Sequence, residues 1–403
     1  MAQATCFRQV YLVDKGGSGQ MGCLAALLAA ASLIGEGLLL RFRAPFADVE
    51  QEQRPGPCPG CVAVFYPGLN GSKCYRIPMM LKTQAGTLIA VAENRINSCG
   101  DNSGRHDLVA RRSTDNGKTW GELILMYRAQ IPCPTCADAT SNPNLVEVDF
   151  HNGSSAILMH FDTMNNPNVE HHGLDMQIWS HDDGKTWGNV SKINFGKTLS
   201  NVGEMIGPSQ GLQGASGTLY FSARGVGGQN VSNFLYWSHD FGQTWEASNA
   251  TLNRSFGNEA SIAFLESSDD ERIVMNVRTS TGRRAQAVWG LNHTPSEVFW
   301  PEGLVDPGCQ GSIVNDGGIL YLSNPSSLHY RQHMTVKESH DQGRTWSTGK
   351  LVWPKASGYS QLVPLGGGKL GLLFEAGVVN PADTVSFVLV DVSEQWNMLP
   401  VVV

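Results

Sequence analysis

The chain has 403 residues, of which 41% are hydrophobic and 16% are charged, a balance that excludes a protein disordered throughout. Its net charge is −7 and it has no lysine-rich run, which argues against nucleic acid as a partner, because phosphate binding depends on a positive field. Forty-five glycines and 19 prolines indicate many turns, and therefore many short strands.

An apolar segment at residues 21–34 follows Arg8 and Lys15, an order of charge and hydrophobicity that is typical of a secretory signal peptide. An uncleaved membrane anchor is the first alternative, although Glu36 would then have to enter the bilayer, and a buried helix is the second. We assign residues 1–60 to a signal peptide or membrane-anchor segment plus linker. This assignment predicts the secretory pathway and leaves a lysosomal, a secreted and a membrane-anchored location open.

Two further features depend on that location. Sequons for N-glycosylation begin at Asn70, Asn152, Asn189, Asn230, Asn249, Asn253 and Asn292. Paired cysteines occur as CPGC at residues 58–61 and CPTC at residues 133–136, both in proline-rich loops. Oxidation in the secretory pathway favours disulfides at these pairs, with free thiols or a zinc site of four thiolates as alternatives.

The first predicted hairpin places two arginines at its open end. Its apolar strands flank a turn at Ala85 and Gly86, and pairing about that turn puts Arg76 opposite Arg95. Two like charges in that position repel each other unless a carboxylate or an acidic ligand compensates them.

An octapeptide of the form Ser-x-Asp-x-Gly-x-Thr-Trp recurs four times, at residues 113–120, 180–187, 238–245 and 339–346. The last interval is the longest, and a degenerate copy at residues 292–300 lies within it. Strand-and-turn repeats of this kind indicate a β-propeller. We interpret each copy as a turn lock without chemistry, with calcium binding at the Asp as the alternative, and expect the histidines at its variable position to be exposed: His181, His239 and His340.

Two later hairpins also end in polar pairs. Pairing about residues 268 and 269 places Glu259 opposite Arg278, and pairing about Gly367 places Tyr359 opposite Glu375. Solvated side chains at strand ends would explain any one such pair. Three hairpins with the same feature favour a common site.

The motif YRIP at residues 75–78, combined with the four octapeptides, resembles the exo-α-sialidase (neuraminidase) family. The stretches GTLIAVAENR, GCQGSI, YLSNP, GYSQL and LLFEAG also match, in the family's order, so that the resemblance covers roughly residues 62–393. It implies an all-β fold, a six-bladed β-propeller of four-stranded antiparallel blades, in a catalytic domain at residues 61–403.

The resemblance also implies how an acidic sugar is bound. Arg76, Arg278 and Arg331 match the three arginines that bind the carboxylate of sialic acid, and a guanidinium offers paired donors suited to that group. Arg95 matches a further arginine near the substrate. Glu375 matches the carboxylate that holds the first arginine in place.

For the reaction, the resemblance implies Tyr359 as the nucleophile and Glu259 as the base that activates it. Asp101 matches the general acid and base, and Asp107 competes with it on spacing, although Asp107 falls at the start of a predicted strand. No metal or cofactor is required.

The implied function is that of a retaining exo-α-sialidase, which hydrolyses terminal sialic acids from glycoproteins, glycolipids and oligosaccharides through a covalent tyrosyl intermediate. Sialylated glycans are then the partner. Two alternatives stay open: a trans-sialidase, which transfers the sugar to an acceptor, and a propeller that binds sialoglycans without cleaving them.

Overall fold

The computed structural model describes residues 53–101, 104–129, 138–163, 174–195, 204–225, 232–248, 257–267, 269, 271–295, 298–394 and 396. The chain divides into two units, residues 1–50 and 51–403, and every described residue lies in the second. The apolar segment at residues 21–34 and the CPTC motif lie outside the described residues. Within the described ranges no helix is long and apolar enough to cross a membrane.

The described chain consists of strands and two short 3-10 helices, η1 (Leu69–Gly71) and η2 (Pro381–Asp383), which confirms the predicted all-β class. One sheet joins nine strands: β2 (Cys74–Lys82), β3 (Leu88–Arg95), β4 (Arg105–Ser113), β5 (Ile124–Tyr127), β6 (Asp138–Asp149), β7 (Ser155–Thr163), β8 (Leu174–Ser180), β9 (Ser191–Lys192) and β11 (Ser209–Gln210). Strand β6 pairs in parallel with β4 and antiparallel with β7, so it connects two antiparallel groups.

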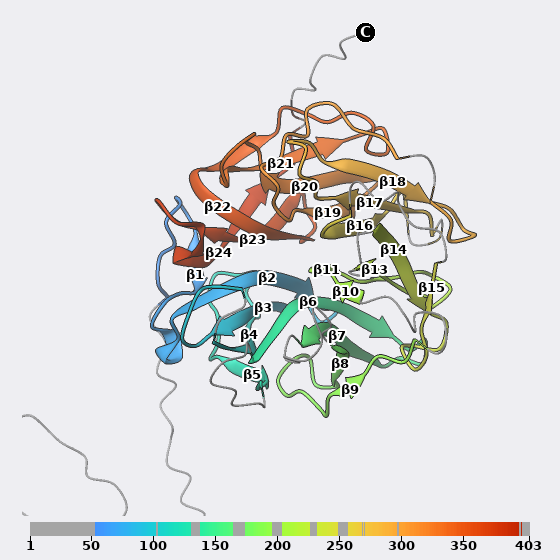
Figure 1. Ribbon diagram of the computed structural model, residues 1–403, viewed down its shortest axis with the longest axis horizontal. Helices are drawn as coiled ribbons and strands as arrows, with labels where there is room; N and C mark the ends of the chain where they lie inside the picture. The colour runs from blue at the N-terminus through green and yellow to red at the C-terminus, as the bar shows by residue number, and fades with distance from the viewer. Residues whose placement is uncertain are drawn as a thin grey trace, which may run out of the picture. The chain divides into compact units, whose positions relative to one another are not determined.

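The middle of the chain forms two smaller antiparallel sheets (Figure 1). The first contains β10 (Glu204–Ile206), β12 (Leu212–Gln213), β13 (Leu219–Gly225), β14 (Ser232–Ser238) and β15 (Glu246–Ala247). The second contains β16 (Ala260–Phe264), β17 (Ile273–Val277) and β18 (Ala285–Trp289).

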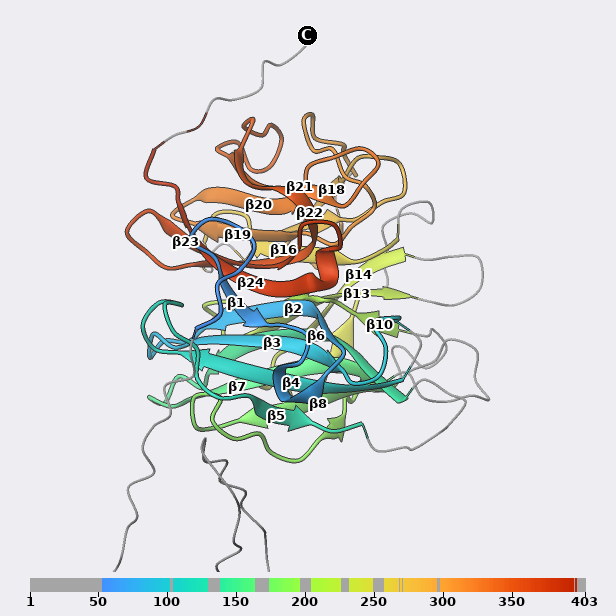
Figure 2. The same ribbon diagram turned by 90° about the vertical axis from the view of Figure 1, so that its left-hand side faces the viewer.

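The last sheet has seven strands: β1 (Val62–Phe65), β19 (Ser312–Asp316), β20 (Ile319–Pro325), β21 (Gln332–Ser339), β22 (Lys350–Pro364), β23 (Lys369–Ala376) and β24 (Thr384–Asp391). Strand β22 is 15 residues long, and its first part pairs with β21 while its last part pairs with β23. The first strand pairs with the last, since Val62 lies opposite Phe387, and β24 also runs close to β2 (Figure 2).

Inner strands from three of the four sheets contact one another in sequence. Strand β2 contacts β6 and β22, β6 pairs with β11, β11 contacts β16, and β19 contacts both β16 and β22. These strands gather near the middle of the unit in Figure 1. Side chains at their ends are therefore brought together from distant parts of the sequence.

The four octapeptides form the same turn. In the first, Ser113 Oγ donates to Asp115 at 2.8 Å, while the backbone amide and hydroxyl of Thr119 donate to the same carboxylate at 2.9 and 2.6 Å. The bonds repeat around the other three carboxylates, those of Asp182, Asp240 and Asp341. The interpretation as a turn lock is confirmed, and the three histidines are exposed as expected.

The glycine and the tryptophan of each octapeptide have separate roles in this turn. Gly117 has φ 83°, in the left-handed region that glycine adopts without a steric penalty. The tryptophans anchor the turns to the core: Trp120, Trp245 and Trp346 are buried, and Trp187 is half-buried.

Strand register decides where the predicted polar pairs lie. Ala260 pairs with Val277, so the predicted opposition of Glu259 and Arg278 is confirmed, and the Arg278 amide donates to the Glu259 carbonyl at 2.9 Å. In the hairpin about Gly367, Ser360 pairs with Phe374, which confirms the predicted register there.

The prediction that Arg76 faces Arg95 is wrong. Arg76 pairs with Glu93, and Arg95 pairs with Cys74, because the turn closes between Thr83 and Thr87 and a bulge follows Arg76. The shift in register replaces an opposed pair of like charges by an arginine facing a carboxylate.

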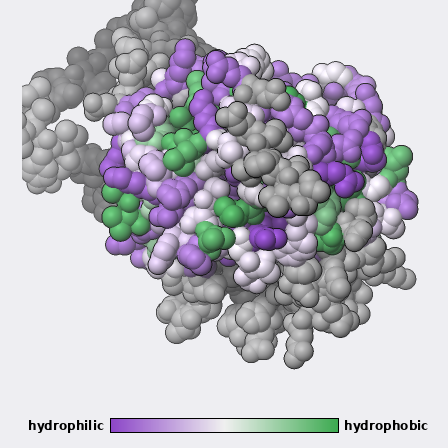
Figure 3. Space-filling model, turned by 90° about the horizontal axis from the view of Figure 1, so that it is seen from above, coloured by the Kyte–Doolittle hydropathy of each residue, from purple (hydrophilic) through white to green (hydrophobic). Residues whose placement is uncertain are grey.

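The surface in Figure 3 mixes hydrophilic and hydrophobic residues, and its hydrophobic areas are small and separate among the coloured residues. The sequon asparagines that fall within the described residues are all exposed: Asn70, Asn152, Asn189 and Asn292. Cys58 and Cys61 form the predicted disulfide.

Candidate active site

Three arginines from three different sheets meet at the phenol of Tyr359 on β22. Arg76 on β2 and Arg331, between β20 and β21, place their guanidinium carbons 5.4 and 5.5 Å from the centre of the ring. Arg278 directly follows β17 and donates from Nη1 to the phenolic oxygen at 3.1 Å. The structure thus brings together the arginines that the sequence predicts, and does not spread them over separate surfaces.

The phenol is paired with a buried carboxylate. The Tyr359 hydroxyl donates to Glu259 Oε1, and Arg278 Nη1 donates to Glu259 Oε2 at 2.6 Å. Arg224 on β13 lies 3.8 Å from the same carboxylate. Both Tyr359 and Glu259 are almost fully buried, so water screens these charges poorly.

This pairing separates the pKa values of the two groups. Burial and the Glu259 carboxylate raise the pKa of Tyr359 well above its ordinary value of 10.0. Burial also raises the pKa of Glu259, but the charges of Arg278 and Arg224 outweigh it and lower that pKa below its ordinary value. The proton therefore resides on the phenol, next to an ionised carboxylate able to accept it.

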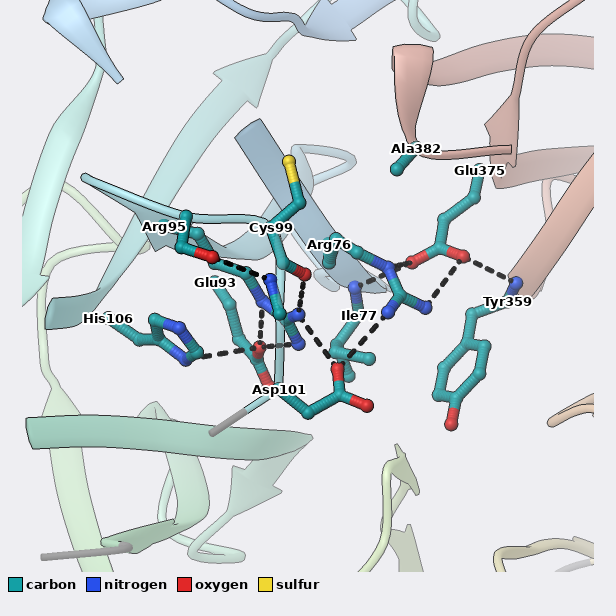
Figure 4. Close-up of polar contacts among 12 residues, drawn as sticks. Arg76, Ile77, Glu93, Arg95, Cys99, Asp101, His106, Tyr359, Glu375 and Ala382 are labelled. Carbon is teal, nitrogen blue, oxygen red and sulfur yellow. Dashed lines mark hydrogen bonds and ion pairs between the residues drawn. The ribbon is translucent and has the colours of Figure 1, made fainter. Parts of the chain in front are cut away.

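Glu375, at the end of β23, holds two parts of the site in register (Figure 4). It accepts two hydrogen bonds from the Arg76 guanidinium, at 2.9 and 3.1 Å, and it accepts at 3.1 Å from the backbone amides of Ile77 and Tyr359. Burial lowers the pKa of Arg76, but the Glu375 carboxylate more than reverses this and raises it, so Arg76 stays charged. One fully buried carboxylate therefore fixes both the arginine and the strand that carries the phenol.

Asp101 lies on the loop after β3, between two arginines (Figure 4). Its Oδ1 accepts from Arg95 at 2.8 Å and from Arg76 at 3.2 Å, although 70% of its side chain is exposed. Burial of the remainder raises the pKa of Asp101, but the hydrogen bond and charge of Arg95 outweigh it and lower that pKa. Asp101 is thus the accessible carboxylate of the cluster.

The competing residue, Asp107, has a different environment. It is buried on β4, where it accepts from the Ala129 amide at 3.0 Å and from Arg105 at 3.1 Å. Both donors are local, because Arg105 lies on the same strand and Ala129 follows β5, which pairs with β4. The geometry favours Asp101 over Asp107 for contact with a ligand.

Sequence reasoning missed two charged neighbours. Glu93 is fully buried and binds Arg95 at 2.6 Å, so Arg95 is held by Glu93 on one side and Asp101 on the other. The correct hairpin register would have revealed Glu93 opposite Arg76. No sequence signal points to Arg224, because its contact with Glu259 joins two separate sheets.

A third missed residue, Asp306, organises the turn under Arg331. One carboxylate oxygen accepts from the backbone amides of Gly308 and Cys309 at 2.7 and 2.8 Å, and the other accepts from the fully buried Arg284 at 2.5 Å. The Gly308 carbonyl in turn accepts from Arg331 at 3.3 Å. Cys309 packs with Tyr359 and Ile77 in a small buried cluster.

The arrangement combines a cluster of guanidinium groups with a phenol, its paired base and an accessible carboxylate. The arginines are able to bind an anion by paired hydrogen bonds. The phenol and Glu259 are able to act as a nucleophile and its base, and Asp101 is placed to exchange a proton with a bound molecule.

Comparison with known proteins agrees with this chemistry. The family described as BNR repeat-like domain matches residues 86–372. A sialidase of Bacteroides fragilis is 28% identical over 92% of this chain and 71% of its own length. A sialidase of Micromonospora viridifaciens is also 28% identical, over 77% of this chain and 51% of its own length, so the chain spans about half of that relative.

Among solved structures, the Hadza microbial sialidase Hz136 superimposes with a TM-score of 0.70 at 23% identity, over 82% of this chain and 68% of that one. At the level of sequence, a third relative, Sialidase-2 of Cricetulus griseus, is 26% identical over 76% of this chain and 90% of its own length. Because the BNR repeat-like domain and these relatives each cover most of the sequence, the chain belongs to the sialidase family of glycoside hydrolases.

Proposed function

We propose that the protein is a retaining exo-α-sialidase, which hydrolyses terminal sialic acids from glycoproteins, glycolipids and oligosaccharides through a covalent tyrosyl intermediate. The observation that carries the proposal is the convergence of Arg76, Arg278 and Arg331 on a phenol that is hydrogen bonded to Glu259. An arginine cluster selects an anionic sugar, and a phenol paired with a base supplies a nucleophile.

The charges of the three arginines support binding of a carboxylate. Arg76 and Arg278 are each paired with a buried glutamate, whereas Arg331 has no carboxylate partner among the described residues and donates only to a backbone carbonyl there. A bound carboxylate would provide the missing counter-charge. A phenol nucleophile suits this ligand, because it is neutral and does not repel the ligand's carboxylate as an ionised side chain would.

In the first half-reaction the Tyr359 oxygen attacks the anomeric carbon while its proton passes to Glu259. Asp101 donates a proton to the glycosidic oxygen as the bond to the leaving group breaks. In the second half-reaction water attacks the anomeric carbon and gives a proton to Asp101, the bond to Tyr359 breaks, and the proton on Glu259 returns to the phenol.

The ion pairs of Asp101 explain how the same residue acts first as an acid. In the free protein Arg95 and Arg76 hold Asp101 in its ionised form. A substrate carboxylate that binds Arg76 takes over part of this positive charge and places a negative charge nearby. Both effects raise the pKa of Asp101, so substrate binding itself favours its protonated form.

We further propose that the strands form a six-bladed β-propeller of four-stranded antiparallel blades. The closed order of contacts between the inner strands supports this, since β2, β6, β11, β16, β19 and β22 each meet the next and β22 meets β2. The two largest sheets each contain a strand that pairs on both sides, β6 or β22, and dividing each sheet at that strand gives two blades. The likeness to the Hz136 fold agrees with this arrangement.

We also infer that the chain enters the secretory pathway, with residues 21–34 as signal or anchor. The Cys58–Cys61 disulfide and the four exposed sequon asparagines support this inference. Expression in a secretory host followed by enzymatic removal of N-glycans tests it. A glycan-dependent mass shift is expected, and a chain without glycans in such a host would contradict it.

The deciding experiment compares wild type with Tyr359→Phe, which removes only the hydroxyl. We expect wild type to release sialic acid from a fluorogenic sialoside and the variant to lose this activity while keeping the wild-type circular dichroism. Tyr321→Phe is the matched control, because Tyr321 is buried in a separate cluster on β20. Normal turnover by a folded Tyr359→Phe protein would refute the tyrosyl mechanism.

Product analysis then separates the three candidate activities. Free sialic acid in the presence of excess lactose indicates a hydrolase, and sialyl-lactose indicates a trans-sialidase. Binding of a sialoside without release of sugar by wild type would indicate the non-catalytic alternative. Substrates linked α2,3, α2,6 and α2,8, assayed from about pH 4 to about pH 7, define the specificity.

A further inference from the structure

Two cysteines that the proposed reaction does not use lie beside the residues that hold Asp101. Cys74 is the first residue of β2, two positions before Arg76, and it is fully buried. Cys99 lies on the loop after β3, two positions before Asp101, and it is partly exposed. Both thiols are reduced in this structure.

Strand pairing brings the two cysteines together. Cys74 pairs with Arg95 across the first hairpin, and Arg95 Nη1 donates to the Cys99 carbonyl at 2.6 Å, so the loop after β3 folds back toward the start of β2. The Cys99 thiol points away from the Asp101 carboxylate (Figure 4). Burial, and after it the interaction with Cys99, raise the pKa of the Cys74 thiol above its ordinary value, which agrees with the proximity that the strand pairing implies. Asp101 and the thiol contact thus lie on opposite sides of one short loop.

We propose that Cys74 and Cys99 form a redox-sensitive disulfide that ties the Asp101 loop to β2. The oxidant is a low-molecular-weight disulfide such as oxidised glutathione. The Cys99 thiolate attacks one of its sulfur atoms and releases one thiol, which leaves a mixed disulfide on Cys99. Cys74 then loses its proton and attacks the Cys99 sulfur, which expels the second thiol.

In this exchange the two cysteines lose two electrons and two protons, and the oxidant gains them as two thiols. The exposures of the two residues suit these roles, because the oxidant can reach Cys99, while Cys74 is shielded and can act only on its neighbour. Cys58 and Cys61 already form a disulfide in the same chain, so an oxidised pair is compatible with its redox state.

The link has a direct consequence for the candidate acid. Among the described residues, Asp101 is held by its two arginine contacts and is otherwise largely exposed. A covalent bond two residues away restricts the loop and keeps Asp101 near Arg76 and Arg95. This consequence rests on the proposed function, whereas formation of the disulfide does not.

Peptide mapping tests the bond itself. Trypsin cleaves after Lys73, Arg76, Arg95 and Arg105, so each cysteine falls on its own short peptide, residues 74–76 and 96–105. After incubation of the folded full chain with oxidised glutathione, we expect one linked species that separates into these two peptides on reduction. Alkylation of both cysteines after this treatment, or linkage of Cys74 to another cysteine, would overturn the proposal.

Thermal unfolding and kinetics test its effect. Oxidation should raise the melting temperature of wild type by an amount on the order of 5 °C and leave that of Cys99→Ser unchanged. The double variant Cys58→Ser, Cys61→Ser is the matched control, because it lacks the other disulfide and should keep the full response to oxidation. Equal responses of wild type and Cys99→Ser would refute the assignment.

On a fluorogenic sialoside, the linked form should have a kcat roughly three- to tenfold above that of the reduced form with a similar KM, because the arginines are unaffected and only the acid is better positioned. An unchanged kcat would refute the connection to Asp101. Wild type that is inactive in both forms, yet yields the linked peptide, would contradict the proposed function and leave the disulfide established.

Discussion

Replacement of Asp306 by Asn tests how the turn beneath Arg331 is stabilised. The Asp306 carboxylate is fully buried and accepts four hydrogen bonds: two from backbone amides, one from Arg284 at 2.5 Å, and one from Asn324 at 3.1 Å. An Asn side chain has one acceptor oxygen in place of two. If that oxygen keeps the amides of the turn, the NH2 group faces the guanidinium of Arg284, so a donor meets a donor.

The magnitude follows from the burial of Arg284. Its side chain is 0% exposed, and its other hydrogen-bond partners among the described residues, Asn276 and the Cys309 carbonyl, are neutral. Removing one partner of a buried ion pair, and so leaving the other charge uncompensated, typically costs about 3–5 kcal/mol of folding free energy. For a chain of this size that loss lowers the thermal midpoint by roughly 5–10 °C.

Thermal and urea unfolding of Asp306→Asn measure this loss. Asp391→Asn is the control: Asp391 forms an ion pair with Lys369 on the surface, and loss of this exposed pair should leave the thermal midpoint unchanged. Combining Asp306→Asn with Arg284→Met removes both buried charges and should recover most of the stability. For the molecules that remain folded, the substitution should raise KM by a larger factor than it lowers kcat, because the turn positions Arg331 through the Gly308 carbonyl. An Asp306→Asn protein as stable as wild type would refute the reasoning.

Three further predictions concern the ligand, the pH dependence and the repeats. Arg76→Lys should lower kcat/KM on a sialoside at least about tenfold, mainly through KM, since lysine cannot keep both hydrogen bonds to Glu375; an unchanged KM would contradict this. The profile of kcat/KM reports the free protein, in which the pKa of Asp101 lies below its ordinary 3.8, so kcat/KM should already fall as the pH rises above about 4. The profile of kcat reports the complex with substrate, in which the pKa of Asp101 is raised, so kcat should fall only at higher pH. If kcat and kcat/KM fall over the same pH range, substrate binding does not raise the pKa of Asp101. Asp341→Ala should cost about 1–3 kcal/mol of folding free energy and leave the activity per folded molecule unchanged. Burial raises the pKa of Asp341, but the hydrogen bonds of the turn outweigh it and hold that pKa below 3.8, so wild type loses this stabilisation as the pH falls below about 4 and the variant has none to lose. Equal losses of stability in acid for wild type and variant would argue against this.

Local patterns in the sequence were sufficient wherever the physics is local. The octapeptide contains its own donor, acceptor and glycine, so its turn could be predicted without tertiary information. The hairpin between Glu259 and Arg278 was also predictable, because apolar strands flank an obvious polar turn and register follows from the turn.

The first hairpin shows where this reasoning stops. Its turn closes between Thr83 and Thr87, so the strand register differs by one residue from the register predicted for a turn centred between Ala85 and Gly86. A bulge after Arg76 then shifts the register again. A bulge leaves no clear mark in the composition of a strand, and a shift of one residue changes which side chains oppose each other. Arg76 therefore faces Glu93, which the sequence did not single out.

Contacts between sheets could not be predicted from local patterns at all. Arg224 reaches Glu259 from another sheet, and the turn at Asp306 is held by Arg284 and Asn324 from two different sheets. In each case the partner is chosen by how sheets pack, and packing carries no periodic signal along the chain. The resemblance to a known family supplied the residues at the centre of the site, whereas the structure supplied the residues that support them.

The three arginines around Tyr359 are unequal, and the inequality bears on selectivity. Glu375 neutralises Arg76 and Glu259 neutralises Arg278, so these two charges are largely compensated before any ligand binds. Arg331 is the exception among the described residues, because its hydrogen bond goes to a neutral carbonyl. A neutral sugar in this position would leave the Arg331 charge uncompensated near a buried phenol, whereas a carboxylate neutralises it and receives paired donors from its neighbours. We infer that the discrimination in favour of an anionic sugar depends most on Arg331, and that Arg76 and Arg278 chiefly fix the orientation of the bound anion relative to the nucleophile.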